Sequence, residues 1–271
     1  MNTSTLISNI EPEKHSGIYW MFSDSWIMTK RSVKHIITNI DQLMSAAIMP
    51  IMFLLLFRYV FGGAINTGET TYVNYLIAGI VVQIATFGAS TTAVNVAVDL
   101  QRGIVDRFRS MPVFSSGLLI GHVVADLVRN SISTVIVIGF SFLIGFRPDA
   151  SPIEWLLVIG ILLLFTFAAS WICAIAGILA KSIEAANWMT FMFIFPMTFA
   201  SSAFVPTDTM PVVLRVFAEN QPFTIVINAM RAWLVGTPIG NDGWLALFWC
   251  LGIIAVAVPI STWLFHHKST R

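Results

Sequence analysis

The chain has 271 residues, of which 56% are hydrophobic and only 11% are charged, and its formal net charge is +1. Soluble domains carry about 25% charged residues, so this composition excludes an ordinary water-soluble domain. The small net charge gives no reason to expect a polyanionic partner, and we predict no binding of nucleic acid. The apolar residues fall in long blocks and the mean hydropathy is +0.80, as expected of helices of about 20 residues that cross a bilayer.

Residues 1–43 are predicted to form a cytoplasmic tail with an amphipathic helix that lies at the membrane surface. Within 18–40, aromatic residues such as Trp20 and Trp26 are mixed with cations such as Lys30. A helix of this kind lies in the interface, with its tryptophans in the apolar layer and its lysines in water. A plainly solvated helix is the alternative. We favour the interfacial helix because an apolar block follows it directly.

Residues 44–271 are predicted to form one all-α transmembrane domain with six spans. The predicted spans lie near 44–62, 73–98, 119–146, 153–180, 186–205 and 244–265. The fifth contains Pro196 and is the least regular. An even number of spans places both termini on one side, and most lysines and arginines flank the spans on that side. The positive-inside rule then predicts that both termini lie in the cytoplasm. We expect a multi-pass protein of the bacterial cytoplasmic membrane.

Polar residues in the second and fifth predicted spans form two helix faces. The first face holds Gln83, Thr86 and Ser90, and the second holds Asn187, Thr190, Thr198 and Ser201. Small and hydroxyl residues commonly mediate helix contacts in lipid, so we favour packing or a dimer face. The alternative is the lining of a translocation path, which would suit an amphiphilic or apolar substrate because these faces carry no fixed charge. Nearby phenylalanines at 87, 191, 195 and 199 add aromatic surface, a weak signal in a chain with 21 phenylalanines.

The cytoplasmic segment 99–112 reads DLQRGIVDRFRSMP. On a short helix, Ile104, Val105 and Phe108 would form one apolar face, with the charged residues on the remaining surface. Such a helix is suited to dock in a groove of a partner protein. A solvated loop that only fixes the membrane topology explains the same spacing equally well.

Three ionisable residues follow at the base of the third predicted span. His122, Asp126 and Arg129 are four and three residues apart and so share one helix face. Asp126 and Arg129 are placed to pair across one turn. Ionisable residues inside a membrane are costly and often functional. We favour a structural ion pair, and a role in coupling or in access to a cavity is the alternative.

The external segment 206–243 is long, half apolar and interrupted by Pro206, Pro211 and Pro222. Its apolar pieces are too short to span a bilayer. The segment is therefore predicted either to lie at the outer surface or to dip into the membrane and return. Irregular backbone at membrane depth is tolerated only where protein or a water-filled cavity satisfies its polar groups.

The sequence contains none of the common catalytic or nucleotide-binding motifs. It lacks a GxxxxGK[ST] phosphate-binding loop, and HExxH, GxSxG and GxGxxG are also absent. The five histidines are scattered, and Cys173 and Cys250 lie in apolar blocks, so we predict no metal site. We expect a chain that is not an enzyme.

The segment 99–112 resembles the cytoplasmic coupling segment of ABC-2 type permeases of the daunorubicin/doxorubicin-resistance type. That pattern is an acidic residue, Arg-Gly, Asp-Arg-Phe-Arg and Pro, and here its residues are Asp99, Arg102, Gly103, Asp106, Arg107, Phe108, Arg109 and Pro112. Residues 121–130 resemble the start of the family's third span. Residues 201–224 resemble its external segment, with Phe204, Pro206, Pro211, Asn220 and Pro222. Arg58 departs from the family pattern. We expect it to extend to the outer headgroups, and a role in substrate binding is the alternative.

The resemblance implies a dimer of two six-helix permeases, here a homodimer surrounded by membrane lipid. It further implies two copies of an ABC ATPase subunit, which would bind the ATP and Mg²⁺, and no cofactor in this chain. Segment 99–112 would transmit the movement of the ATPase. The expected function is export of an amphiphilic or drug-like substrate. The alternatives are export of a lipid-linked glycan or envelope precursor, and a membrane sensor or scaffold without transport.

Overall fold

The computed structural model describes residues 40–65, 70–102 and 117–268, and all its regular elements are helices. The predicted interfacial helix in the N-terminal tail lies outside the described residues, as do residues 103–112 of the predicted coupling segment. Within the described residues the prediction of an all-α fold is confirmed, since they contain no strand.

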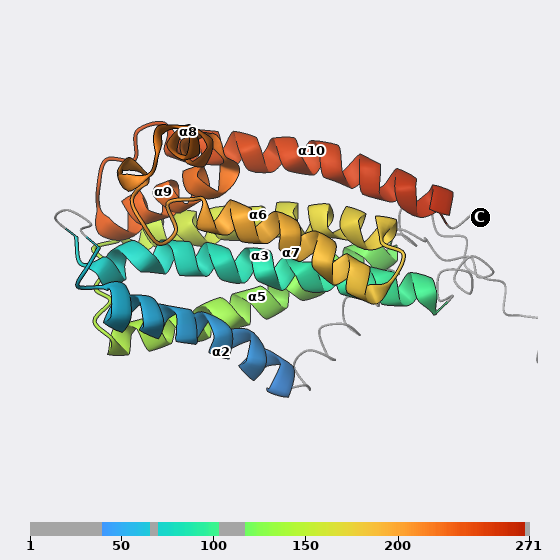
Figure 1. The fold of residues 1–271 in the computed structure, drawn as a ribbon, viewed down its shortest axis with the longest axis horizontal. Helices are drawn as coiled ribbons and strands as arrows, with labels where there is room; N and C mark the ends of the chain where they lie inside the picture. The colour runs from blue at the N-terminus through green and yellow to red at the C-terminus, as the bar shows by residue number, and fades with distance from the viewer. Residues whose placement is uncertain (1–39, 66–69, 103–116, 269–271) are drawn as a thin grey trace, which may run out of the picture.

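Four helices are long and apolar enough to cross a membrane. They are α3 (Tyr72–Gln101), α5 (Gly117–Leu143), α6 (Pro152–Leu179) and α10 (Asp242–Lys268). Two shorter helices accompany them: α2 (Ile40–Leu56), which continues into the π-helix η2 (Phe57–Phe61), and α7 (Ile183–Phe199). Figure 1 shows these helices lying side by side along the long axis of the molecule.

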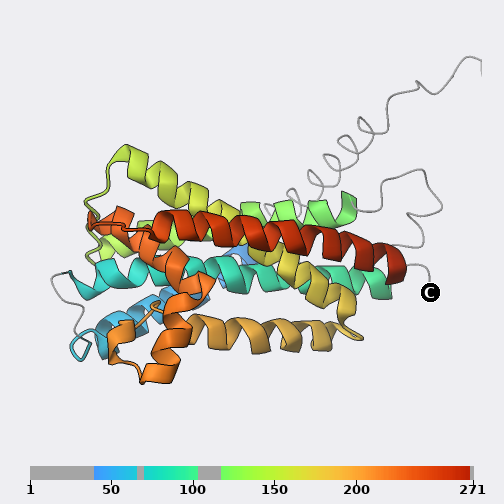
Figure 2. The same cartoon turned by 90° about the horizontal axis from the view of Figure 1, so that it is seen from above.

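The helix α3 is the centre of this bundle. It packs against α2, α5, α6, α7 and α9, and in Figure 2 it runs through the middle of the molecule. Leu76, Ile77 and Ile80 on α3 have no exposed surface. The polar side chains of α3 are therefore placed between helices, where each needs a hydrogen-bonding partner.

Small residues allow the helices to approach α3 closely. A Cβ atom at Gly177 of α6 would lie 2.4 Å from the carbonyl oxygen of Ala93, and one at Gly79 would lie 2.3 Å from that of Ala203. Neither position has room for a side chain. Small residues at helix contacts are typical of membrane bundles, in which close packing drives association.

The helix α7 ends at Phe199, short of the predicted residue 205. Residues 200–204 form turns instead, and Pro196 lies inside the last turn of the helix. The amide of Gln221 explains why the helix can stop there, because its Nε2 donates to the carbonyl oxygens of Met197 (3.0 Å) and Ala200 (2.5 Å). This contact satisfies carbonyl groups that the end of a helix leaves unpaired.

The external segment folds into η3 (Thr207–Thr209), α8 (Val212–Asn220) and α9 (Pro222–Val235). Pro211 precedes α8 and Pro222 occupies the first turn of α9, so the prolines divide the segment as predicted. Figure 1 shows α8 and α9 near the end of the bundle opposite the C-terminus. We call the end that carries the last residues of α3 and α10 the C-terminal end.

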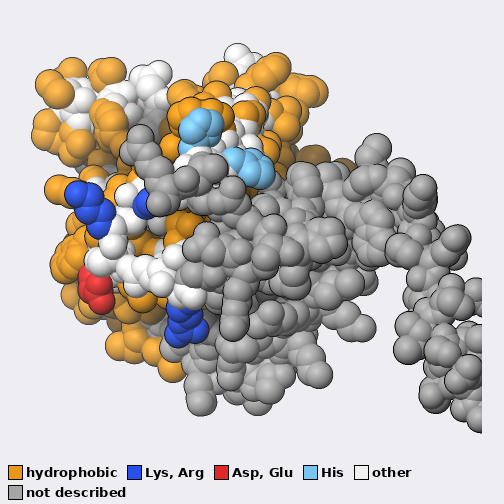
Figure 3. All heavy atoms as spheres, turned by 90° about the vertical axis from the view of Figure 1, so that its right-hand side faces the viewer, with side chains coloured by type: hydrophobic (Ala, Val, Ile, Leu, Met, Phe, Trp, Pro, Cys, Tyr) orange, Lys and Arg blue, Asp and Glu red, His pale blue; other side chains and the backbone are white. Residues whose placement is uncertain are grey.

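Charged side chains occur on the face of the C-terminal end. Figure 3 looks onto this end and shows lysine, arginine, acidic and histidine side chains there, while the visible flanks of the bundle are largely apolar. The described residues of this face include Arg102, Lys181 and Lys268, each exposed. Apolar flanks with a polar end are the surface expected of a bundle that is embedded in a membrane.

Candidate functional site

A row of polar contacts joins α3 and α5, and we call it the polar seam. Its deepest part is the ion pair between Asp126 and Arg129, which are 1% and 4% exposed. Arg129 also donates to the carbonyl oxygen of Gly88 (2.7 Å), and Asp126 accepts from the hydroxyl of Thr92. Each charge is therefore both paired and hydrogen-bonded, as a buried ion pair requires. The predicted pairing of Asp126 with Arg129 is confirmed.

The ion pair lies deeper in the bundle than predicted. Arg129 is close to the midpoint of α5, because Gly117–Leu143 is one uninterrupted helix. Of the three predicted residues, only His122 lies near the C-terminal end of the bundle. Gly88 leaves room beside the pair for the amide of Asn130, with which a side chain at position 88 would collide.

The contact of the seam nearest the C-terminal end joins two groups of residues that the sequence analysis treated separately. His122 Nε2 and Asp99 Oδ2 lie 2.7 Å apart, and both side chains are 15% exposed. Asp99 is the first residue of the predicted coupling segment, and His122 belongs to the predicted polar cluster. The contact ties the end of α3 to the start of α5, which are the two helices that flank residues 103–116.

The spacing of the residues explains why the seam forms. Ala85, Gly88, Thr92 and Asp99 recur on α3 at intervals of three, four and seven, which places them on one helix face. On α5 the facing residues His122, Asp126 and Arg129 recur at intervals of four and three, which also places them on one helix face. Asn130 continues the row, since its Nδ2 donates to the carbonyl oxygen of Ala85 (3.4 Å).

Beside the inner end of the seam lies a cavity of about 380 Å³ between α2, α3, α5 and α7, which we call the aromatic pocket. Its walls include five phenylalanines: Phe53, Phe87, Phe191, Phe195 and Phe199. Its polar residues are Gln83, Thr91, Arg129 and Asn130. Gln83 is 4% exposed, and its Oε1 has no hydrogen-bond partner among the described residues.

The chemistry of the pocket suits an amphiphilic ligand. Ligand sites are commonly apolar and aromatic with a few polar groups that fix orientation. The charge of Arg129 is compensated by Asp126, so the pocket presents aromatic faces and carries no net charge. A donor group on a ligand would satisfy Gln83 Oε1, and the rings would cover an apolar body.

The other predicted polar residues lie in different places. Thr86 faces a second cavity on the far side of α7, and Ser90 donates to the carbonyl oxygen of Phe87 (2.6 Å). Asn187 is exposed. Thr190, Thr198 and Ser201 are buried and are absent from the walls of both cavities.

Sequence reasoning missed the wall residues Phe53 and Asn130 and gave too little weight to the phenylalanines of α7. Phe191, Phe195 and Phe199 recur at every fourth residue, which places them on one helix face. That spacing was the available signal. Phe53 and Asn130 had none, because their contribution depends on how α2 and α5 are placed beside α3.

At the end of the bundle opposite the C-terminal end, side chains from several helices pack around the turn that follows α7. Phe204 is 4% exposed and stacks on Phe57, with ring centroids 4.4 Å apart. Tyr72 donates to the carbonyl oxygen of Phe204 (3.0 Å), and Arg231 donates to that of Ser202 (2.6 Å). The other predicted external residues, Pro206, Pro211, Asn220 and Pro222, lie along η3, α8 and the start of α9.

Of the predicted coupling residues, Asp99 and Arg102 are described, and Arg102 is exposed at the end of α3. The remaining ones, Gly103, Asp106, Arg107, Phe108, Arg109 and Pro112, lie outside the described residues.

Comparison with known proteins gives consistent results. The family described as "ABC-2 type transporter" matches residues 24–235. The chain is 29% identical over 230 residues to the "Daunorubicin resistance ABC transporter permease protein DrrB1" of Streptomyces coeruleorubidus, covering 85% of this chain and 81% of that protein. It is 26% identical over 256 residues to the "Probable doxorubicin resistance ABC transporter permease protein DrrC" of Mycobacterium tuberculosis, covering 92% and 91%.

Proposed function

Because this chain belongs to the ABC-2 type transporter family, we propose that it is the permease subunit of an ATP-driven exporter of amphiphilic or drug-like molecules. The observation that carries the proposal is the continuity of the polar seam with the aromatic pocket, since Arg129 belongs to both. The similarity to permeases named for daunorubicin and doxorubicin resistance supports outward transport of such molecules.

The proposed topology has six spans, which are α2 with η2, α3, α5, α6, α7 and α10. The C-terminal end then faces the cytoplasm, with both termini and residues 1–43 on that side. The helix α9 supports a re-entrant external segment rather than one that lies on the surface. Phe223, in its first turn, packs edge to face on Phe165, midway along α6, with ring centroids 5.3 Å apart. Ile227 and Met230 on α9 have no exposed surface.

The proposed energy source is a separate ABC ATPase, in two copies that bind the ATP and Mg²⁺. The chain has no phosphate-binding loop, and its described part forms no nucleotide-binding domain. The named relatives are permeases of ABC transporters, which act with such ATPases. We infer a homodimer because the aromatic pocket is incompletely enclosed by one chain. Phe191 and Phe195 in its wall remain 43% and 41% exposed. A second permease would cover them.

The proposed mechanism is mechanical. Segment 99–112 would move with the ATPase, and the contact between Asp99 and His122 would make α3 and α5 move with it as one unit. The ion pair and its bond to Gly88 extend this unit to the middle of the bundle. A movement of the unit would change the position of Arg129 and Asn130 in the wall of the aromatic pocket. Switching of this kind requires two positions of one element that bind the cargo differently.

The proposal is tested by separating ATP hydrolysis from transport. The chain and its ATPase are reconstituted in lipid vesicles, and drug moved per ATP hydrolysed is measured. We expect Asp99→Asn and His122→Asn each to lower this ratio about tenfold, while hydrolysis continues. Because the two residues act as one contact, the double variant should be no worse than either single variant.

Asp208→Asn is the matched control. It removes a carboxylate from an exposed pair with Arg215 (2.7 Å) at the opposite end of the bundle. We expect its transport ratio to remain that of the unaltered chain. An unchanged ratio in both seam variants would refute the mechanism, and absence of ATP-dependent transport in the unaltered complex would refute the export function. Stimulation of hydrolysis by a lipid-linked glycan but by no drug would reassign the cargo.

A further inference from the structure

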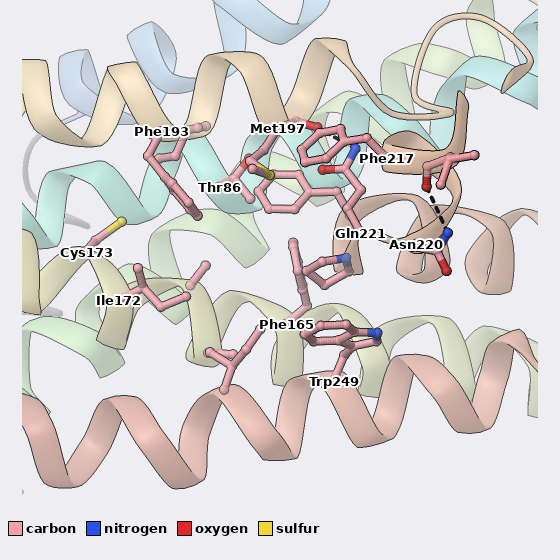
Figure 4. A pocket seen from close by; sticks show the side chains of 17 residues that line it. Thr86, Phe165, Ile172, Cys173, Phe193, Met197, Phe217, Asn220, Gln221 and Trp249 are labelled. Atoms are coloured by element: carbon pink, nitrogen blue, oxygen red, sulfur yellow. Dashed lines mark hydrogen bonds between the residues drawn. The ribbon is translucent and has the colours of Figure 1, made fainter. Parts of the chain in front are cut away.

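A second cavity of about 640 Å³ lies on the opposite side of α7 from the aromatic pocket. We call it the lateral groove. Figure 4 shows it between α7 and α10, with α6 behind it and the junction of α8 and α9 at one end. The two cavities use different faces of α7, because Phe193 and Met197 line the groove whereas Phe191 and Phe195 line the pocket. The groove is therefore a separate space.

The groove opens to the side of the bundle. Its floor on α6 includes the small residues Ala169 and Cys173. Phe193 and Trp249 stand on its two sides and remain 46% and 43% exposed. Figure 4 shows both rings directed into the space from α7 and α10. In a bilayer this opening faces hydrocarbon, so a molecule would reach the groove from the membrane.

The polar end of the groove lies deep in the bundle. Gln221 is at this end, beside Met197 and Phe217 (Figure 4). It is close to the level of Phe165, which is midway along α6, while Cys173 marks the part nearer the C-terminal end. From Phe165 to Cys173 the helix rises about 12 Å, at about 1.5 Å per residue. The groove thus runs from a polar end near the middle of the bundle to an apolar end nearer the C-terminal end of the bundle.

One polar atom in this space is left without a partner. Gln221 is 5% exposed, and both described hydrogen bonds of its side chain are made by Nε2. Its Oε1 is buried and has no hydrogen-bond partner among the described residues. The hydroxyl of Thr86, which also lines the groove, donates to the carbonyl oxygen of Val82 (3.0 Å). A buried acceptor is costly unless a donor reaches it, and the groove is the space from which one can come.

We propose that the lateral groove binds an amphiphile with a compact apolar body and a hydroxyl or amine that donates to Gln221 Oε1. A phospholipid chain does not meet this requirement, because it ends in a methyl group at the depth of Gln221. The volume is within the range of about 300–1,000 Å³ that is usual for sites of drug-sized ligands. The role of the site rests on the proposed export function: it takes cargo from the hydrocarbon layer before the cargo reaches the aromatic pocket.

The test uses photolabelling of the full chain with its ATPase in lipid vesicles. The probes are 4-[3-(trifluoromethyl)diazirin-3-yl]benzyl alcohol and its methyl ether, which differ in the hydrogen-bond donor. Labelled residues are located by mass spectrometry. We expect the alcohol to label α6, α7 and α10 around the groove roughly fivefold more than the ether, the factor given by one hydrogen bond of ordinary net strength.

Ala169→Trp fills the groove and should abolish this labelling, whereas Leu163→Trp, outside the groove on the same helix, should leave it unchanged. Gln221→Leu should remove the preference for the alcohol. Equal labelling by the two probes, or labelling that persists in Ala169→Trp, would overturn the site. Because photolabelling needs no ATP, groove labelling without transport would refute only the export function. Transport without groove labelling would refute only this inference.

Discussion

Asp126 and Arg129 carry formal charges in the interior of the bundle, where they are 1% and 4% exposed. Removing one member of a buried pair leaves the other charge uncompensated, at a cost of about 3–5 kcal/mol. We therefore expect Asp126→Asn, which preserves the shape of the side chain, to lower the free energy of unfolding by about 3 kcal/mol. Denaturant unfolding of the protein in detergent micelles measures this change.

Arg215→Gln is the matched control for this prediction. Arg215 pairs with Asp208 and Glu219 on the exposed outer segment, at 2.7 Å in each case. The hydrogen bond from Arg215 holds the pKa of Glu219 below its usual value, but water and salt screen such exposed pairs. The loss of stability should be much smaller than that of Asp126→Asn. Equal losses in the two variants would contradict the role assigned to burial.

Residue contacts within one helix could be predicted, and contacts between helices could not. The pair of Asp126 with Arg129 follows from a spacing of three on α5. The contact of Asp99 with His122 spans 23 positions and depends on which faces of α3 and α5 meet. The same uncertainty affected Gln83 and Thr86, which were predicted to share one face of α3 but line different cavities.

At the scale of the helices, the crossing of α3 and α6 depends on Gly177. A Cβ atom there would lie 2.4 Å from the carbonyl oxygen of Ala93, which belongs to the backbone and cannot rotate away. We expect Gly177→Ala to force the helices apart and to lower the free energy of unfolding by about 1–3 kcal/mol. Gly160→Ala is the control on the same helix, because nothing lies within 4 Å of its added Cβ.

The control should be neutral or slightly stabilising, since alanine favours a helix over glycine by about 0.5–1 kcal/mol. Unfolding curves of both variants, recorded under one set of conditions, give the comparison. If Gly177→Ala were as stable as Gly160→Ala, close packing at this crossing would not be a determinant of the fold.

The long helices could be predicted because each is an apolar block of sufficient length. The predicted spans near 73–98 and 153–180 correspond to α3 and α6, within a few residues at each end. The end of α7 could not be predicted, because its last carbonyl groups are satisfied by Gln221, more than 20 positions further along the chain. The prolines indicated where α8 and α9 begin. The amino-acid composition of these two helices did not reveal that α9 is buried.

At the scale of the whole molecule, α7 separates two cavities of different character. The aromatic pocket lies beside the polar seam, and the lateral groove lies on the other side, against α6 and α10. Periodicity identifies the apolar and polar faces of α7, but not which cavity each face lines. That assignment needs the packing of α7 against α3 and α6.

The proposed orientation leads to a test of the whole fold. Asp208, in η3, and Lys181, between α6 and α7, are both exposed. These two segments lie at opposite ends of the bundle (Figure 1). The native cysteines, Cys173 and Cys250, are buried at 4% and 0% exposure, so the unaltered chain should give little background with a thiol reagent. In intact cells, a membrane-impermeant maleimide should label Asp208→Cys, and Lys181→Cys should react only after the membrane is permeabilised. Labelling of both variants in intact cells would contradict the proposed topology, and the reverse pattern would place the C-terminal end outside. Either result would also contradict the cytoplasmic position of segment 99–112. It would then refute the proposed contact through which an ATPase moves the polar seam.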